Sequence, residues 1–297
     1  MGYLLFQITL FAYFLATAAY MVYFWSQRPE IRTTARGILI GSGLLHTLYM
    51  IVRYIEAGHT PLTNHHETVS FFAWSLTWGY LSFHWRYNVR NFGSFVSPLI
   101  TILMLIATFS SREIMPLPPA LKSAWLPVHA SIAIMANGFL ALAFCGGIMY
   151  LLQERGLKKK RFGLFYTRLP SLDSLDQLNS HCLAVGFPLL TLGIITGSIW
   201  AKQAWGTYWQ WDPKETWSLI TWFLYAALLH QRFTVGWRGR RAAIMAIIGF
   251  SAAIFTLWGV TYLLGGIHSY VGLKDHDPRG KPQDCPGGNS RAIILLQ

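Results

Sequence analysis

The chain has 297 residues, of which 53% are hydrophobic, 15% aromatic and 12% charged, with a mean hydropathy of +0.37. Soluble globular domains carry about a quarter charged residues, so this composition all but excludes a water-soluble enzyme and a disordered chain, and three cysteines with no close pair exclude a disulfide scaffold. The formal net charge of +12 does not indicate nucleic acid, because the basic residues alternate with long apolar runs, as they do in a membrane protein.

Eight apolar segments are long enough to cross a bilayer as helices, which takes about 20 residues each. They cover residues 3–25, 37–55, 67–85, 93–110, 127–152, 181–203, 215–233 and 242–267. The runs are continuous rather than alternating, which favours helices over a β-barrel. The first run has no basic start and no small-residue cleavage site, so we expect a span rather than a signal peptide. The predicted fold class is an all-α polytopic membrane protein with eight transmembrane helices.

The basic residues predict the orientation of these helices. Of the 24 lysines and arginines, 15 lie in the loops that follow the odd-numbered segments. These are Arg28, Arg32, Arg36, Arg86, Arg90, Arg155, Lys158, Lys159, Lys160, Arg161, Arg168, Arg232, Arg238, Arg240 and Arg241. Positively charged loops mark the cytoplasmic face. We therefore expect both termini on the outer, periplasmic side of a bacterial cytoplasmic (inner) membrane.

Two polar stretches lie outside the apolar segments. The connection 153–180 is basic and then amphipathic, which predicts a short surface helix on the cytoplasmic side. Residues 272–297 are polar and rich in proline and glycine steps, so we expect a disordered tail. The predicted organisation is therefore one transmembrane domain, 1–271, followed by the tail 272–297.

The predicted external loop 203–217 carries the most unusual composition in the chain. Four of the thirteen tryptophans lie in its last thirteen residues, Trp205–Trp217, which we call the tryptophan loop. An aromatic belt at the membrane interface is the simplest interpretation, but it does not account for the Asp212-Pro-Lys-Glu core. Ring faces with fixed charges suit a large flat ligand that carries anionic groups. Asp212 and Glu215 have the alternative role of capping the next helix.

Ten histidines occur, and three of them stand out by position. His129 and His268 lie at the outer ends of their predicted spans, and histidines from separate segments are the usual axial ligands of six-coordinate haem iron. His230 lies near the inner end of its span, roughly 22 Å from Glu215 at 1.5 Å per residue, and ionisable groups in a span are functional candidates. For His46 an interhelical hydrogen bond and a ligand role both stay open. We favour interfacial placement for His84 and His181, and a solvated loop or helix cap over metal ligation for His65 and His66.

The tryptophan loop resembles the signature of the haem-handling proteins of cytochrome c maturation. The matching pattern is Trp205-Gly206-x-x-Trp209-x-Trp211-Asp212-x-Lys214-Glu215. The length, the eight spans and the segment Pro61-Leu62-Thr63-Asn64-x-x-Glu67, with Phe71-Phe72-Ala73-Trp74 after it, resemble the CcsA (ResC) family within that superfamily. The resemblance covers residues 1–272.

The resemblance implies a haem site on each side of the membrane. His129 and His268 match the ligands of an outer haem iron, and His230 matches the ligand of an inner, transmembrane haem iron. The residues that match the haem-contacting signature are Trp205, Gly206, Trp209, Trp211, Asp212, Lys214 and Glu215. The family pairs its inner histidine with one from a CcsB (ResB)-type partner. No histidine of this chain can be assigned that partner role, because His84 has a suitable depth but no motif around it.

The implied cofactor is haem b, iron protoporphyrin IX, and the implied function is haem transport and its ligation to the Cys-x-x-Cys-His motif of apocytochrome c. The chain would then be the membrane half of a CcsB–CcsA cytochrome c synthase, a thioether-forming haem lyase, with a thioredoxin-like thiol reductant in the pathway. Three alternatives stay open. They are a b-type membrane cytochrome that carries electrons, a haem exporter without ligation activity, and a transporter or channel for another solute, which no paired carboxylates or broken-helix repeats favour.

Overall fold

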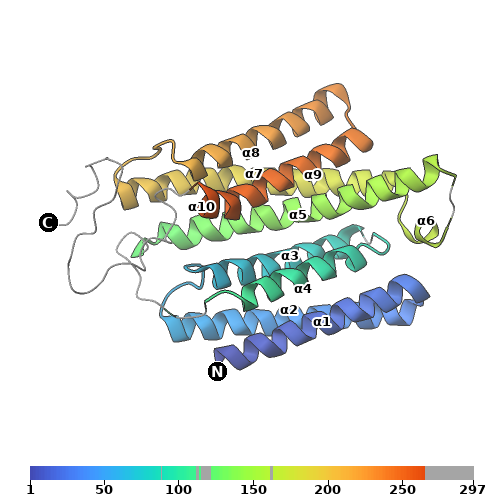
Figure 1. Cartoon of the computed structure of the whole chain (residues 1–297), viewed down its shortest axis with the longest axis horizontal. Helices are drawn as coiled ribbons and strands as arrows, with labels where there is room; N and C mark the ends of the chain where they lie inside the picture. The colour runs from blue at the N-terminus through green and yellow to red at the C-terminus, as the bar shows by residue number, and fades with distance from the viewer. Residues whose placement is uncertain (88, 112–113, 115–121, 161–162, 265–297) are drawn as a thin grey trace.

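The structure is a computed structural model that describes residues 1–87, 89–111, 114, 122–160 and 163–264. Within these residues it contains helices and no strands (Figure 1). The α-helices are α1 (Gly2–Ser26), α2 (Pro29–Ala57), α3 (His65–Tyr87), α4 (Gly93–Thr108), α5 (Trp125–Lys158), α6 (Leu164–Arg168), α7 (Leu172–Trp205), α8 (Pro213–His230), α9 (Arg240–Ile254) and α10 (Val260–Leu263). Two π-helical turns, η2 (Gln231–Val235) and η3 (Phe255–Gly259), follow α8 and α9.

Each predicted apolar segment coincides with a helix, the last one with α9, η3 and α10 as far as residue 264. Among the described residues, five helical segments are both long and apolar enough to cross a membrane: α1, α2, α5, α7 and Arg240–Gly259. The chain is therefore a multi-pass membrane protein. Helix α4 has only 16 residues, or about 24 Å against a hydrocarbon core of about 30 Å. The count of eight spans and the orientation of the termini stay predictions.

Helix α5 lies at the centre of the bundle. It packs along α7 on one side and against α3 on the other, and α9 also contacts it (Figure 1). Small residues allow the α5–α7 approach, because a Cβ atom placed on Gly193 would lie 3.3 Å from the Cα atom of Ala133. Helices α1 to α4 form the other half of the bundle. The close contact between α5 and α7 therefore fixes which residues of the two helices lie opposite each other.

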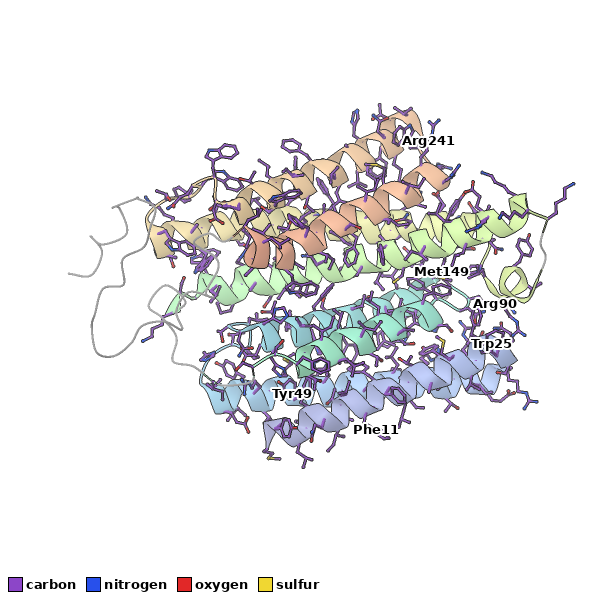
Figure 2. The ribbon with its side chains drawn as sticks, in the orientation of Figure 1. Phe11, Trp25, Tyr49, Arg90, Met149 and Arg241 are labelled. Atoms are coloured by element: carbon purple, nitrogen blue, oxygen red, sulfur yellow. The ribbon has the colours of Figure 1, made fainter. Side chains whose placement is uncertain are left out.

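The two ends of the bundle differ in character. Arg90 and Arg241 lie at the same end, which we call the basic end, while Phe11 faces outward along the side of the bundle (Figure 2). The tryptophan loop, between α7 and α8, lies at the opposite end (Figure 1). The alternating helix directions thus gather the connections that we predicted to be cytoplasmic at one end.

The prediction of a separate surface helix in 153–180 is wrong for most of that stretch. Helix α5 continues to Lys158, and α7 begins at Leu172, well before the apolar run that starts at 181. Ser171 caps α7 by accepting a hydrogen bond from the Ser174 N–H at 3.2 Å. In the described part of this connection, only α6, five residues long, is a separate helix. The polar residues of this connection therefore extend a membrane helix instead of forming one of their own.

Two buried histidines hold α1 to α4 together towards the end of the bundle that carries the tryptophan loop, which we call the loop end. The interhelical hydrogen bonding left open for His46 is confirmed, because Nδ1 lies 3.1 Å from the Tyr13 hydroxyl and Nε2 lies 2.9 Å from the Ser70 hydroxyl. The expectation of a solvated or capping His66 is wrong. His66 is 1% exposed and lies between the Tyr49 hydroxyl, at 2.8 Å, and the backbone carbonyl of residue 107, at 2.7 Å. These imidazoles serve packing.

Candidate functional site

The tryptophan loop leaves α7 and enters α8 through residues suited to those turns. Helix α7 ends at Trp205, and Gly206 then takes a left-handed conformation, with φ of 82°, which glycine adopts at little cost. Its N–H donates to the carbonyl of Lys202 at 3.0 Å. Pro213 occupies the first position of α8, where its missing N–H is not needed. The tryptophan loop is thus short and held at both ends.

The acidic residues of the loop form a capping box at the start of α8. The Asp212 carboxylate accepts a hydrogen bond from the Lys214 N–H at 3.0 Å. The Glu215 carboxylate accepts from the N–H groups of Gln210, at 2.8 Å, and of Asp212, at 3.3 Å. The capping role that the sequence left open for both residues is therefore present. Their carboxylates fix the course of the loop.

Replacing Asp212 with alanine is expected to destabilise α8 and the loop by about 1 kcal/mol, the usual cost of losing an N-cap. Asparagine at the same position keeps an acceptor oxygen and is the matched control. Thermal unfolding in detergent measures the difference. Equal stability of the alanine and asparagine variants would contradict a structural role for this cap.

The loop presents both an exposed ring and a buried donor. Trp211 is 69% exposed and takes a left-handed conformation at φ of 58°, which is uncommon for a bulky residue and often marks functional sites. Its ring meets that of Trp209 edge to face, with centroids 5.8 Å apart. The indole N–H of Trp209 is buried and has no acceptor within the described residues. An unsatisfied buried donor fits a site that a ligand acceptor completes.

The two lysines near the loop differ in their surroundings. The Lys202 ammonium donates to the Gly206 carbonyl at 2.8 Å and lies 5.5 Å from the centre of the Tyr208 ring. Lys214 lies just ahead of the predicted span, and burial lowers the pKa of its ammonium, while the nearby Asp212 carboxylate partly opposes that change. Lys214 is therefore the better-placed cation for an anionic ligand group, since Lys202 already binds backbone.

His129 lies at the loop end of α5, where α7 holds it. Its Nδ1 atom lies 2.8 Å from the carbonyl oxygen of Gly193. Its ring is nearly parallel to that of Trp200, at 11° and with centroids 5.9 Å apart. Trp200 in turn packs edge to face on Trp205, with centroids 4.6 Å apart. The structure thus links His129 to the tryptophan loop through Trp200, a residue that the sequence analysis did not single out.

Of the other two predicted ligands, only His230 lies within the described residues. His268 lies outside the described residues, as does the tail 272–297. His230 is exposed at the basic end of α8, with the Thr234 hydroxyl 3.4 Å from its Nδ1 atom. The π-helical turn η2 begins immediately after it, and such turns are rare and frequent at functional sites. His230 and the tryptophan loop therefore lie at opposite ends of the bundle.

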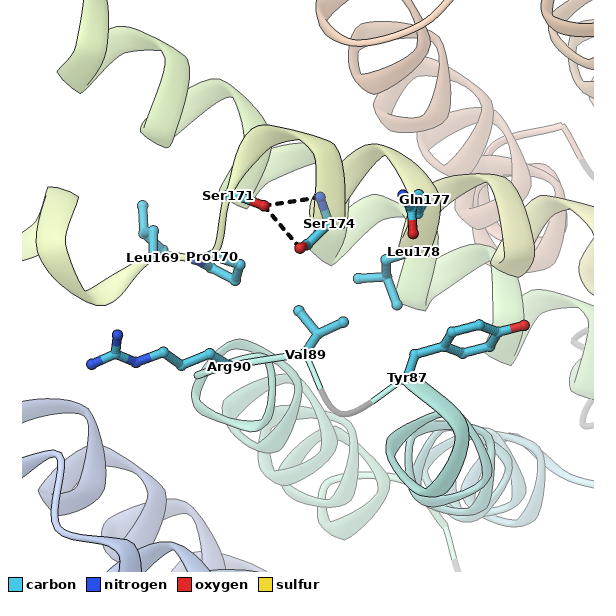
Figure 3. A pocket seen from close by; sticks show the side chains of 9 residues that line it. All are labelled: Tyr87, Val89, Arg90, Leu169, Pro170, Ser171, Ser174, Gln177 and Leu178. Carbon is cyan, nitrogen blue, oxygen red and sulfur yellow. Dashed lines mark hydrogen bonds between the residues drawn. The ribbon is translucent and has the colours of Figure 1, made fainter.

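A cavity of about 350 Å³ opens at the basic end, and none of the predicted site residues lines it (Figure 3). It lies between the α3–α4 connection and the start of α7. Its lining residues are Tyr87, Val89, Arg90, Leu169, Pro170, Ser171, Ser174, Gln177 and Leu178. The hydroxyls of Ser171 and Ser174 bind each other at 2.8 Å, and the Arg90 guanidinium binds the side chain of Gln27 at 2.7 and 2.9 Å. The two serine hydroxyls and the Arg90 guanidinium of the wall are therefore already engaged.

The sequence of this chain matches the profile of a known protein family. The sequence profile described as "Cytochrome C assembly protein" matches residues 62–268, more than half of the chain. The chain therefore belongs to the cytochrome c assembly protein family, and this membership gives it a role in cytochrome c maturation.

The relatives are more specific. The chain is 38% identical over 243 residues to the cytochrome c biogenesis protein CcsA of Guillardia theta, covering 75% of this chain and 81% of the relative. It is 38% identical to CcsA of Chlamydomonas reinhardtii, covering 78% and 67%, and 33% identical to CcsA of Synechococcus sp. (strain JA-2-3B'a(2-13)), covering 84% and 90%. The resemblance to the CcsA family is thereby confirmed.

A solved structure shares the fold. The cytochrome c haem lyase CcmF superposes with a TM-score of 0.60 at 16% sequence identity, over 86% of this chain and 46% of CcmF. The chain thus spans less than half the length of that protein. At this identity the likeness concerns the arrangement of helices alone.

Proposed function

We propose that this chain is the membrane half of a cytochrome c synthase. It receives haem b at an inner site that includes His230, and presents haem at an outer site to the Cys-x-x-Cys-His segment of apocytochrome c. Its partner is a CcsB (ResB)-type protein, and a thioredoxin-like reductant keeps the apocytochrome cysteines as thiols. The setting is a bacterial cytoplasmic membrane with the tryptophan loop facing the periplasm.

The observation that carries this proposal is the continuous contact from His129 through Trp200 to Trp205. It joins an imidazole that suits haem iron to a loop whose groups suit the rest of the molecule. The exposed face of Trp211 fits the porphyrin plane, and the Trp209 N–H and the Lys214 ammonium fit its carboxylates. His268 supplies the second imidazole in this proposal.

At the outer site the chain positions groups and supplies no acid or base of its own. Haem brings the vinyl groups, and each cysteine S–H adds across one C=C bond, forming a C–S bond and a C–H bond with no net oxidation or reduction. The loop holds the vinyl edge towards the arriving peptide, whose histidine replaces one of the chain's own imidazoles. Rate enhancement then comes from orientation.

The electron-carrier alternative has less support. A b-type cytochrome needs paired histidines facing each other within the bundle. Both ring nitrogens of His46 already bind hydroxyl groups, and Nε2 of His84 lies 3.4 Å from the Arg36 guanidinium. His230 faces outward, which suits a ligand shared with a partner protein.

The test is the haem content and visible spectrum of the chain purified with its CcsB-type partner. His129→Ala and His268→Ala are each expected to lose low-spin haem, with recovery on added imidazole, and to form at least tenfold less holocytochrome c in cells. His181→Ala, at the basic end, is the matched control. Full low-spin haem in both site variants would overturn the outer site. Loss of low-spin haem with no loss of holocytochrome c would favour the exporter alternative.

A further inference from the structure

Helices α5 and α7 meet most closely near the loop end. A Cβ atom on Gly193 would lie 3.3 to 3.5 Å from backbone and side-chain atoms of Ala133. At this separation the carbonyl of Gly193 is within reach of a side chain on α5. It accepts from Nδ1 of His129 at 2.8 Å and also from the Thr196 hydroxyl at 3.1 Å. Backbone, which does not change rotamer, therefore holds the imidazole.

The next glycine on the same face of α7 gives the imidazole its space. A Cβ atom on Gly197 would lie 2.7 Å from Cε1 and 2.8 Å from Nδ1 of His129. These separations are shorter than van der Waals contact, so any side chain at this position displaces the ring. The ring has little room to move while keeping its bond to Gly193 and its parallel arrangement with Trp200.

The acceptor also sets the tautomer of His129. A carbonyl oxygen only accepts, so Nδ1 must carry the hydrogen, and the lone pair lies on Nε2. Metal-binding histidines commonly donate their second ring nitrogen to a carbonyl or carboxylate, which fixes both the tautomer and the ring plane. The same imidazole thus has a fixed plane, a fixed tautomer and a lone pair directed away from the α7 carbonyl.

We propose that Gly193, Gly197 and Trp200 form a cradle on α7 that orients the His129 imidazole for iron coordination. The three are positioning residues and act through His129 without touching iron. This inference rests on the proposed function, since it assigns a purpose to the orientation of a residue that the proposed function makes a ligand. If the cradle is correct, the outer haem site depends on the α5–α7 contact as well as on the tryptophan loop.

Gly197→Ala tests the cradle in the chain purified with its CcsB-type partner. The variant is expected to weaken haem binding 10- to 100-fold, the usual cost of disturbing groups behind a metal ligand, and to shift the retained haem from low spin towards high spin. Added imidazole restores the low-spin spectrum, because free imidazole replaces a misaligned ligand but does not refold a protein. Gly41→Ala on α2 is the matched control, since its Cβ atom meets nothing within 4 Å.

Trp200 provides a second pair of variants that leave both glycines intact. Trp200→Leu removes the parallel ring and is expected to reproduce the imidazole-dependent loss of low-spin haem, whereas Trp200→Phe keeps a ring and most of the signal. If Gly197→Ala lowers the yield of folded protein, this pair decides the matter.

The outcomes separate the two levels of inference. If His129→Ala itself leaves low-spin haem unchanged, the proposed outer site is wrong. If His129→Ala removes it while Gly197→Ala and Trp200→Leu both behave like Gly41→Ala, the site stands and the cradle is overturned.

Discussion

Replacing Glu67 with alanine is expected to lower the free energy of unfolding by about 3–5 kcal/mol, the usual cost of leaving a buried charge without its partner. The Glu67 side chain is 1% exposed, and its Oε1 atom lies 2.9 Å from Nε of Arg53, which is 10% exposed. Its other oxygen accepts from the N–H and the hydroxyl of Thr63, both at 3.0 Å. Alanine lacks the carboxylate, so the substitution removes all of these interactions at once.

The loss is expected to reach beyond the ion pair, because Glu67 joins three elements. Arg53 lies in the last turns of α2, Thr63 in the α2–α3 connection and Glu67 in the first turn of α3. The backbone N–H of Glu67 also donates to the side chain of Asn64 at 2.8 Å. The segment Pro61–Glu67 that resembles the CcsA family is therefore held in place by its own glutamate.

Unfolding in detergent, followed by circular dichroism, measures the effect. Glu30→Ala is the matched control, because Glu30 is exposed in the first turn of α2. Glu67→Gln keeps the shape and part of the hydrogen bonding and is expected to fall between the two. A Glu67→Ala variant as stable as Glu30→Ala would show that this ion pair contributes nothing to stability.

Hydropathy located the helices well because long apolar runs have no alternative to helix inside a bilayer. It failed at polar helix extensions and at single buried histidines. Helix α7 begins nine residues before its apolar run because Ser171 caps it and Asp176 finds a partner in Arg232. His66 is buried because Tyr49 and a carbonyl of α4 satisfy both of its nitrogens. Neither set of partners is adjacent in the sequence.

The candidate site likewise contains residues that the sequence identified and a residue that it did not. The tryptophan loop and His129 were recognisable from residue types and spacing alone. The role of Trp200 was not, because it depends on the register between α5 and α7, which is set by side-chain volumes across the interface. A usable signal was present: Gly193 and Gly197 lie one turn apart on a long apolar helix, where small residues mark close helix contacts. His129 lies opposite them.

Asp176→Ala is expected to be about as damaging as the loss of Glu67, at about 3–5 kcal/mol. The Arg232 guanidinium binds both carboxylate oxygens, at 2.7 and 3.1 Å, and also the Ser180 hydroxyl at 2.9 Å. The Gly239 N–H donates to the same carboxylate at 2.7 Å.

Alanine at 176 leaves the Arg232 charge, which is 8% exposed, and the Gly239 N–H without this partner. Asp173→Ala is the matched control, since Asp173 is exposed on the same helix and binds only Gln177 among the hydrogen bonds of the described residues. Unfolding in detergent compares the two variants. A loss no larger than that of Asp173→Ala would contradict the importance of this ion pair.

The position of the ion pair extends this prediction to function. Asp176 fixes Arg232 two residues after His230, within the π-helical turn that continues α8. If that turn is loosened, the exposed His230 imidazole no longer has a fixed orientation, so less haem is expected at the proposed inner site. The proposed site at His129, at the opposite end of the bundle, is expected to keep its low-spin spectrum. Equal loss at both sites would instead indicate global unfolding. Selective loss at the inner site would show that the Asp176–Arg232 ion pair, between the start of α7 and η2, orients His230.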